Sequence, residues 1–220
     1  MNLISLFQEL SLEEVLGVDV GGVIIDRVND GTDTSFFGHN FLQTTAVPDV
    51  FDVLKSLSGR FSKIVVVSKC GQRIQEQTLK WLDHQEFYQR TGILNSDVHF
   101  CRERRDKAGI CQRLSVTHFV DDRLEVLGYL TTVSNLYLFR PSDNEVRKFA
   151  RFLPRVKRVE TWREIASELI SEDKISKTIP LKSGVYVGRG VSIFLCRSYD
   201  GTLRRPLQSG IFKWRAHCRV

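Results

Sequence analysis

The stretch from Val15 to Asp26 constrains this chain more than any other part of the sequence. It is a short apolar run that ends in Asp19 and is followed by Gly21 and Gly22. A run of this kind is typical of a buried strand in a parallel sheet. The residue that follows such a strand lies at the carboxyl edge of the sheet, where open α/β folds bind ligands. The sequence therefore predicts an acid at a ligand-binding edge.

Three further chemical groups follow in order along the chain. A second apolar run ends at Ser68, and Lys107 precedes a third run, Val116–Val120. That third run ends in the pair Asp121 and Asp122. Two strands that end in carboxylates, one that ends in a hydroxyl group and a lysine could together hold a divalent cation and a phosphoryl group.

The order and chemistry of these elements resemble the haloacid dehalogenase (HAD) superfamily, whose members are mostly phosphatases that work through a phosphorylated aspartate. The resemblance covers about residues 15–170. It implies an α/β fold with three layers, in which a Rossmann-like, doubly wound parallel sheet lies between helices. It also implies Mg²⁺ as the cofactor and a phosphorylated compound as the substrate.

The resemblance further implies a role for each residue of the site. Asp19 would be the nucleophile, Ser68 and Lys107 would be catalytic residues that bind the phosphate, and Gly22 would also contact it. The residues expected to hold the cation all supply hard oxygen atoms: Asp19, the Gly21 carbonyl, Asp121 and Asp122. Of the last two, Asp121 is favoured because it comes first after the apolar run.

Each of these residues also has an ordinary explanation when it is taken alone. An aspartate at the end of a strand is usually a turn residue or a helix cap, and the pair Asp121 and Asp122 could cap a helix. Ser68 alone would be a cap, and Lys107 alone a solvated surface charge. The prediction depends on all of them occurring in the expected order.

One departure from the pattern weakens the enzymatic interpretation. In phosphatases of this superfamily the residue two positions after the nucleophile is typically a second aspartate that acts as general acid and base, whereas here it is Gly21. Losing such a group typically costs ~10²–10⁴-fold in rate. Asp26 and His39 are candidates for a substitute, although His39 is more simply a surface loop residue and is left out of the site. The alternative is a non-catalytic binding or scaffold protein.

The spacing between these residues limits the size of any insertion over the site. There are 48 residues between Asp19 and Ser68, and 38 between Ser68 and Lys107. After one helix is allowed for, residues 22–47 suffice for a small flap but not for a cap domain. The sequence therefore predicts an open, capless site suited to a macromolecular or exposed phosphoester.

Strand and helix patterns alternate up to residue 170. Helices are expected at 48–57, 73–84, 106–114, 123–130, 143–152 and 162–170. Strands are expected near 15–18, 64–67, 98–101, 116–120, 135–139 and 156–159. Thr161 and Glu164 have the spacing of a capping box before the last helix. This alternation predicts a parallel sheet with helices on both faces.

Charge is unevenly divided along the 220 residues. Residues 171–220 contain ten Lys and Arg against three Asp and Glu, a balance of +7, whereas residues 1–170 contain 22 against 23, a balance of −1. Together they give the net charge of +6. We therefore expect a HAD-like hydrolase domain over 1–170 and a basic C-terminal extension over 171–220.

The basic extension itself allows two interpretations. Residues 184–195 have the pattern of two strands around a Gly-Arg-Gly turn, as in a β-hairpin. The basic and aromatic residues that follow suit a nucleic acid or an acidic partner. Because no nucleic-acid motif accompanies them, a solvated extension explains the same composition.

Composition also bears on where the protein functions. No apolar stretch approaches the ~20 residues that span a bilayer, so no membrane contact is expected. Residues 1–14 suit a short amphipathic helix better than a signal peptide. The cysteines are odd in number and form no CxxC pair: Cys70, Cys101, Cys111, Cys196 and Cys218. Reduced thiols in a cytoplasmic protein are the simplest account.

Overall fold

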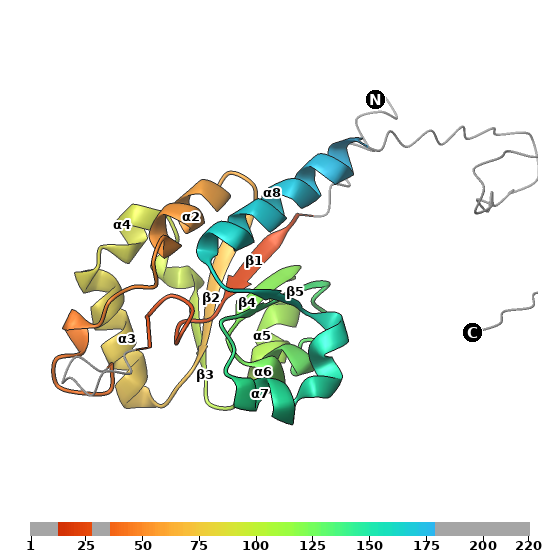
Figure 1. Cartoon of the computed structure of the whole chain (residues 1–220). Helices are drawn as coiled ribbons and strands as arrows, with labels where there is room; N and C mark the ends of the chain where they lie inside the picture. The colour runs from red at the N-terminus through yellow and green to blue at the C-terminus, as the bar shows by residue number, and fades with distance from the viewer. Residues whose placement is uncertain (1–12, 28–35, 179–220) are drawn as a thin grey trace, which may run out of the picture. The chain divides into compact units, whose positions relative to one another are not determined.

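The computed structural model describes residues 13–27 and 36–178, and the side chains of these residues up to 170 (Figure 1). The chain divides into two units after Ile179, and all the described residues belong to the first. The expected N-terminal helix over 1–14 falls almost entirely outside the described residues. The expected hairpin at 184–195 lies wholly outside them, so it stays a prediction.

Within the described part of the chain, six strands form one sheet in the order β3-β2-β1-β4-β5-β6, and every neighbouring pair is parallel. The strands are β1 Val15–Val18, β2 Lys63–Lys69, β3 Val98–Cys101, β4 His118–Asp121, β5 Asn135–Phe139 and β6 Lys157–Val159. The chain winds outward from β1 in both directions, so β1 and β4 meet at the switch point of a doubly wound sheet. This confirms the predicted α/β class.

Burial explains why the central strands are short apolar runs. All four residues of β1 and all four of β4 are buried, whereas the edge strand β6 has two exposed residues. Close packing extends to Gly17 in β1, because a Cβ atom there would lie 2.4 Å from the Phe119 ring. The middle of the sheet therefore has no room for a larger residue at this position.

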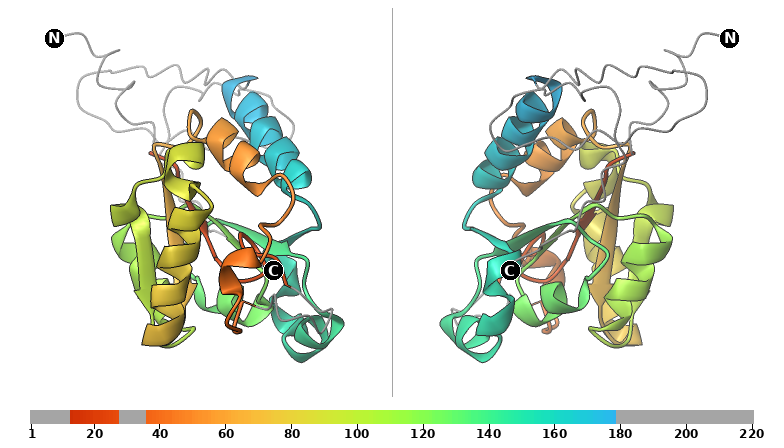
Figure 2. Two further views of the ribbon diagram at one scale, coloured as in Figure 1. Left: turned by 90° about the vertical axis from the view of Figure 1, so that its left-hand side faces the viewer. Right: turned by 90° about the vertical axis from the view of Figure 1, so that its right-hand side faces the viewer.

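Helices cover both faces of the sheet. The first face packs against α2 Val50–Leu57, α3 Gln72–His84, α4 Phe87–Thr91 and α8 Trp162–Thr178. The second packs against α5 Asp106–Arg113 and α6 Leu124–Tyr129, with α7 Asp143–Lys148 next to α6. Among the described residues there are also short 3₁₀ turns: η1 Phe41–Gln43, η2 Asn95–Asp97 and η3 Ala150–Arg155. Figures 1 and 2 show α2 and α8 side by side.

The single helix predicted over 143–152 is wrong. The helix α7 ends at Lys148, and η3 follows it after Phe149, whose ψ of 23° is not helical. Pro154 lacks a backbone N–H and disfavours a helical conformation in the residue before it, so an α-helix does not continue through this segment. The sequence patterns also missed α4 and the short turns η1 and η2.

The predicted capping box at the start of α8 is half formed. The Glu164 backbone N–H donates to Oγ1 of Thr161 at 3.1 Å, as expected for a cap. The Glu164 carboxylate, however, accepts from the N–H of Glu160 instead of from that of Thr161. The helix α8 runs to Thr178, eight residues beyond its predicted end.

Two further findings concern the described residues as a whole. Within residues 13–27 and 36–178, no helix is both long and apolar enough to cross a membrane. In the same part of the chain, Cys70, Cys101 and Cys111 are buried free thiols. The cytoplasmic location stays a prediction.

Candidate active site

The backbone places two acids next to each other at the switch point. In the β1–β4 pair Val18 lies opposite Val120, and the N–H of Asp19 donates to the Val120 carbonyl at 3.0 Å. Asp121 is the last residue of β4, so its side chain emerges beside that of Asp19. Register alone therefore brings together carboxylates that are about a hundred residues apart in the sequence.

Lys107 lies between these two acids. Its Nζ donates to Oδ1 of Asp19 at 2.6 Å and to Oδ2 of Asp121 at 2.8 Å. The Lys107 side chain is 2% exposed although it comes from α5. A charge this deeply buried persists only when it is paired, so Lys107 and the two acids form one electrostatic unit.

Burial and neighbouring charges act against each other on the pKa values of this unit. Burial lowers the pKa of Lys107, but the charges of Asp121 and Asp19 outweigh it and raise that pKa above its ordinary value. Burial raises the pKa of Asp121 to about 6, against the opposing charge of Lys107 and with the support of Asp19. The Oδ1 atom of Asp121 also accepts the N–H of Arg123 at 2.8 Å, which fixes the carboxylate.

Asp122 has a different cation as its partner. It forms an ion pair with Arg27, and Nε of Arg123 lies 3.8 Å from its Oδ2 atom. Gly22 makes room for this pair: it has φ +80°, and a Cβ atom there would lie 2.6 Å from Nε of Arg27. The sequence analysis missed Arg27 because a lone arginine in a polar stretch carries no local signal.

A tight turn follows Asp19 and ends at Asp26. The N–H groups of Ile24 and Ile25 both donate to the Val20 carbonyl at 2.9 Å, and Gly22 N–H donates to the Ile25 carbonyl at 2.8 Å. This turn leaves Gly21 open, because a Cβ atom there would meet nothing within 4 Å.

The three acids suit a hard divalent cation. One carboxylate oxygen from each of Asp19, Asp121 and Asp122 lies within 4.8 Å of the others, and all three residues are buried. Oxygen ligands of this kind are those that Mg²⁺ prefers. Repulsion among the three acids does not by itself require a metal, because Lys107 and Arg27 already supply positive charge.

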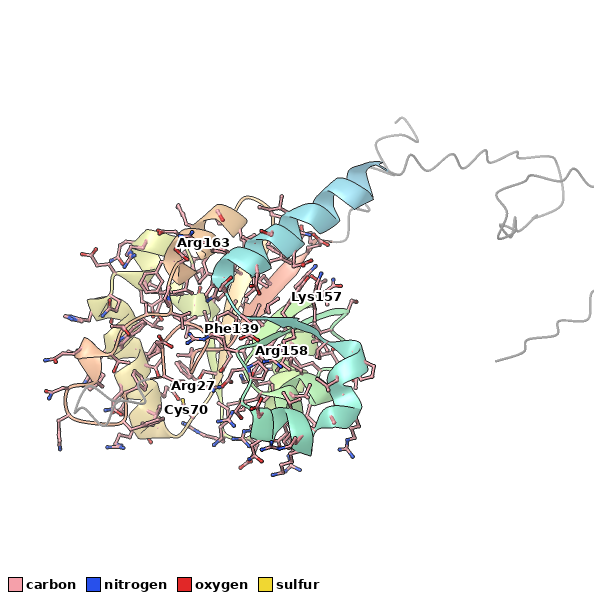
Figure 3. All side chains as sticks on the ribbon, in the orientation of Figure 1. Arg27, Cys70, Phe139, Lys157, Arg158 and Arg163 are labelled. Carbon is pink, nitrogen blue, oxygen red and sulfur yellow. The ribbon has the colours of Figure 1, made fainter. Side chains whose placement is uncertain are left out.

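A pocket of about 560 Å³ lies next to the three acids and Lys107. Its lining includes all the predicted site residues: Asp19, Gly21, Gly22, Ser68, Lys107, Asp121 and Asp122. Arg27 and Cys70 also line it, and Figure 3 labels both. Burial raises the pKa of the Cys70 thiol, which disfavours the nucleophilic thiolate.

The two candidates for a substitute acid separate in the structure. Asp26 lines the main pocket, where its Oδ1 atom accepts from Nη1 of Arg140 at 3.1 Å. His39 lies instead in a smaller pocket of about 150 Å³, beside Arg73 and Gln77. Of the two, Asp26 is therefore the better placed.

No model of a protein family matches this sequence, and no curated protein matches it. Solved structures do match it by fold. D,D-heptose 1,7-bisphosphate phosphatase from B. bronchiseptica, solved with magnesium and phosphate, has a TM-score of 0.51 at 15% identity, over 72% of this chain and 99% of that chain.

Two more structures match at lower scores. The 3-deoxy-D-manno-octulosonate 8-phosphate phosphatase from Moraxella catarrhalis, solved with magnesium, phosphate and KDO, has a TM-score of 0.40 at 14% identity, over 80% and 99% of the two chains. The HAD domain of effector protein Lem4 from Legionella pneumophila has a TM-score of 0.41 at 9% identity, over 74% and 97%.

The fold and the site define a Rossmann-like α/β protein whose polar side chains converge at the switch point of a parallel sheet. Its fold is the doubly wound α/β fold that the order of the motif residues predicted, and it is similar to the fold of the B. bronchiseptica phosphatase.

Proposed function

We propose that this protein is a phosphohydrolase that depends on Mg²⁺ and works through Asp19. The observation that carries the proposal is the position of Lys107, which is buried and holds Asp19 at 2.6 Å and Asp121 at 2.8 Å on the floor of the pocket. If Lys107 only formed a structural ion pair with Asp19 and Asp121, no third acid would be needed beside them. A carboxylate oxygen of Asp122 nevertheless lies within 4.8 Å of oxygens of both. Magnesium in the B. bronchiseptica phosphatase agrees with this donor set.

In the proposed reaction, a carboxylate oxygen of Asp19 attacks the phosphorus atom and the bond from phosphorus to the leaving oxygen breaks. Lys107 orients Asp19 through Oδ1 and offsets the negative charge of the phosphate, while the Ser68 hydroxyl donates to a phosphate oxygen. Water then attacks the aspartyl phosphate, which releases inorganic phosphate and restores Asp19.

Asp19, Asp121, Asp122 and the Gly21 carbonyl would hold the cation, and Gly22 would lie against the phosphate. Bound there, Mg²⁺ would stabilise the charge that develops on the phosphoryl oxygens.

Proton transfer is the step for which this chain lacks the usual residue. Gly21 has no side chain that could act as an acid or a base. The leaving oxygen must take up a proton in the first half of the reaction, and the attacking water must lose one in the second half. We assign this step to Asp26, because it is the nearest acid along the chain that lines the pocket and lies outside the metal set. Its carboxylate is held at Oδ1 by the N–H of Arg27 at 2.9 Å.

We propose further that the site is open to large or exposed phosphoesters. The residues between Ser68 and Lys107 are accounted for by α3, α4, η2 and β3, which belong to the sheet and its helical layer. The exposed ring of Phe37 at the pocket is available to a substrate.

The experiment that tests the proposed function is Mg²⁺-dependent phosphate release across a panel of sugar phosphates, nucleotides, phosphopeptides and phosphate-ended oligonucleotides. Asp19→Asn is the inactive control, because its amide is a far weaker nucleophile than a carboxylate. Release that requires both Mg²⁺ and Asp19 supports the proposal. Folded protein that releases no phosphate from any substrate overturns it and favours a non-catalytic binding protein.

We also propose that the basic extension over 171–220 binds a nucleic acid or another acidic partner, since all of the excess positive charge lies there. Removal of residues 179–220 leaves α8 intact and should abolish retention on a phosphorylated oligonucleotide column at 0.1 M salt. Unchanged retention of the shortened protein would contradict this role.

A further inference from the structure

Three arginines from different parts of the fold lie close to one another: Arg27 and Arg123 line the pocket, and Arg140 contacts Asp26, which also lines it. Arg27 follows the turn after β1, Arg123 precedes α6, and Arg140 follows β5. Arg27 and Arg123 both approach the Oδ2 atom of Asp122. The N–H of Arg27 and Nη1 of Arg140 both donate to Oδ1 of Asp26, at 2.9 and 3.1 Å. Asp122 thus connects the guanidinium groups of Arg27 and Arg123, and Asp26 connects the backbone of Arg27 with the guanidinium group of Arg140.

Holding these cations together has an electrostatic cost. The guanidinium groups of Arg27 and Arg123 both approach the Oδ2 atom of Asp122, so these two like charges lie close enough to repel each other. The three side chains are 38%, 43% and 43% exposed, so they remain accessible from the solvent side. A group of like charges that is partly desolvated and still accessible suits the binding of an anion.

The backbone at Arg140 is strained in addition. Its φ of +42° lies in the left-handed region, where a residue other than glycine costs roughly 1–3 kcal/mol. The N–H of Arg140 donates to the Val159 carbonyl at 3.0 Å, which fixes this conformation. Glycine would adopt this conformation without strain. Arg140 therefore carries its side chain at this position at a cost in stability.

We propose that Arg27, Arg123 and Arg140 bind a second phosphate of the substrate, separate from the phosphoryl group that Asp19 attacks. The inference rests on the proposed function and narrows its substrate class to phosphoesters that carry two phosphate groups. A guanidinium group can bind two phosphate oxygens at once, so three of them suit a phosphate dianion, which would compete with the ion pairs that Arg123 and Arg140 form with Glu145 and Asp26.

The test measures binding by calorimetry with Asp19→Asn protein in the presence of Mg²⁺, so that turnover does not interfere. The probes are propyl phosphate and the bisphosphates of 1,3-propanediol and 1,5-pentanediol, which differ in the second phosphate and its reach. We expect at least one bisphosphate to bind about tenfold or more tightly than propyl phosphate. That preference corresponds to one charge-assisted hydrogen bond or more.

Variants then identify the residues responsible. Arg123→Gln and Arg140→Gln should each remove most of the preference and change the affinity for propyl phosphate less than twofold. Arg163→Gln removes an exposed arginine of α8 that pairs with Asp49 and does not line the pocket, and it should change neither affinity. Arg140→Gly should lose the preference while its melting temperature rises, which separates ligand binding from folding.

The inference would be overturned if the parent protein bound mono- and bisphosphates with equal affinity. It would also be overturned if the arginine variants lowered the affinity for both kinds of ligand by the same factor. The proposed function fails separately, if the parent protein releases no phosphate from any ester while the bisphosphate preference persists.

Discussion

Nζ of Lys107 lies 2.6 Å from Oδ1 of Asp19, although 87 residues separate them in the sequence. Lys107 lies in α5, whereas Asp19 directly follows β1. The contact joins α5 to the end of β1 and places an ammonium group against the proposed nucleophile. Its geometry explains how one lysine can serve both folding and chemistry.

Lys107→Met should destabilise the protein by about 3–5 kcal/mol, because it leaves Asp19 and Asp121 buried without their cation. Urea denaturation without divalent metal measures this loss. Lys157→Met is the matched control: Lys157 pairs with Glu168 on the surface, and such pairs contribute about 0–1 kcal/mol. If the two variants unfold at the same urea concentration, Lys107 does not hold the site together.

Cation binding should depend on pH through Asp121, whose pKa burial raises to about 6. Below that pH the carboxyl group holds a proton, and a cation that binds the carboxylate must displace it. Mg²⁺ affinity should therefore fall as the pH drops from 7 to 5, and binding at pH 5 should release protons. Titration calorimetry in buffers with different ionisation enthalpies measures both effects.

Asp121→Asn provides the comparison for this pH dependence. The amide does not titrate, so the variant should bind Mg²⁺ more weakly at pH 7 and lose most of the pH dependence between 5 and 7. An affinity that keeps the parent's pH dependence would assign the titrating group to another residue.

The order of acids, hydroxyl group and lysine could be predicted because each follows or precedes a local apolar pattern. Asp19 and Asp121 end apolar runs, and parallel register then determines that they meet. Arg27 and Arg140 could not be found in this way. Arg140 contacts Asp26 across 114 residues, and neither its charge nor its strained φ leaves a trace in the neighbouring sequence.

The failure over 143–152 has a similar origin. Apolar spacing there is compatible with one helix, but the chain leaves helical geometry at Phe149, and Phe152 packs with the core from η3. Tertiary packing thus decided between two short elements and one long one. The roles of the site residues stay predictions until catalysis is measured.

Gly17→Ala should cost about 1–3 kcal/mol, because its Cβ would lie 2.4 Å from the Phe119 ring in the centre of the sheet. Thermal unfolding measures the effect, and Phe119→Leu in the same chain should recover part of it by removing the overlapping ring atoms. Gly59→Ala, where a Cβ meets nothing within 4 Å, should leave the melting temperature nearly unchanged. Equal effects at Gly17 and Gly59 would contradict the packing described here.

The neighbouring glycines of the site should respond in opposite ways. Gly22→Ala should destabilise the protein by more than about 1 kcal/mol, because φ is +80° and the new methyl group would meet Arg27 and Asp122. Gly21→Ala should fold like the parent, since a Cβ there meets nothing within 4 Å. Denaturant midpoints of the two variants, measured side by side, decide this contrast.

Gly21→Asp uses the same open space to introduce the acid that the haloacid dehalogenase pattern would place at this position. If the native site is an enzyme limited by proton transfer, its rate of phosphate release should rise by up to ~10²–10⁴-fold, and Asp26→Asn should then matter less than it does in the parent. Single-turnover assays with Mg²⁺ compare the four combinations of the two positions. Activity that falls in Gly21→Asp while the fold and Mg²⁺ binding are retained would mean that the native reaction depends on the glycine, with Asp26 already in the role of acid and base.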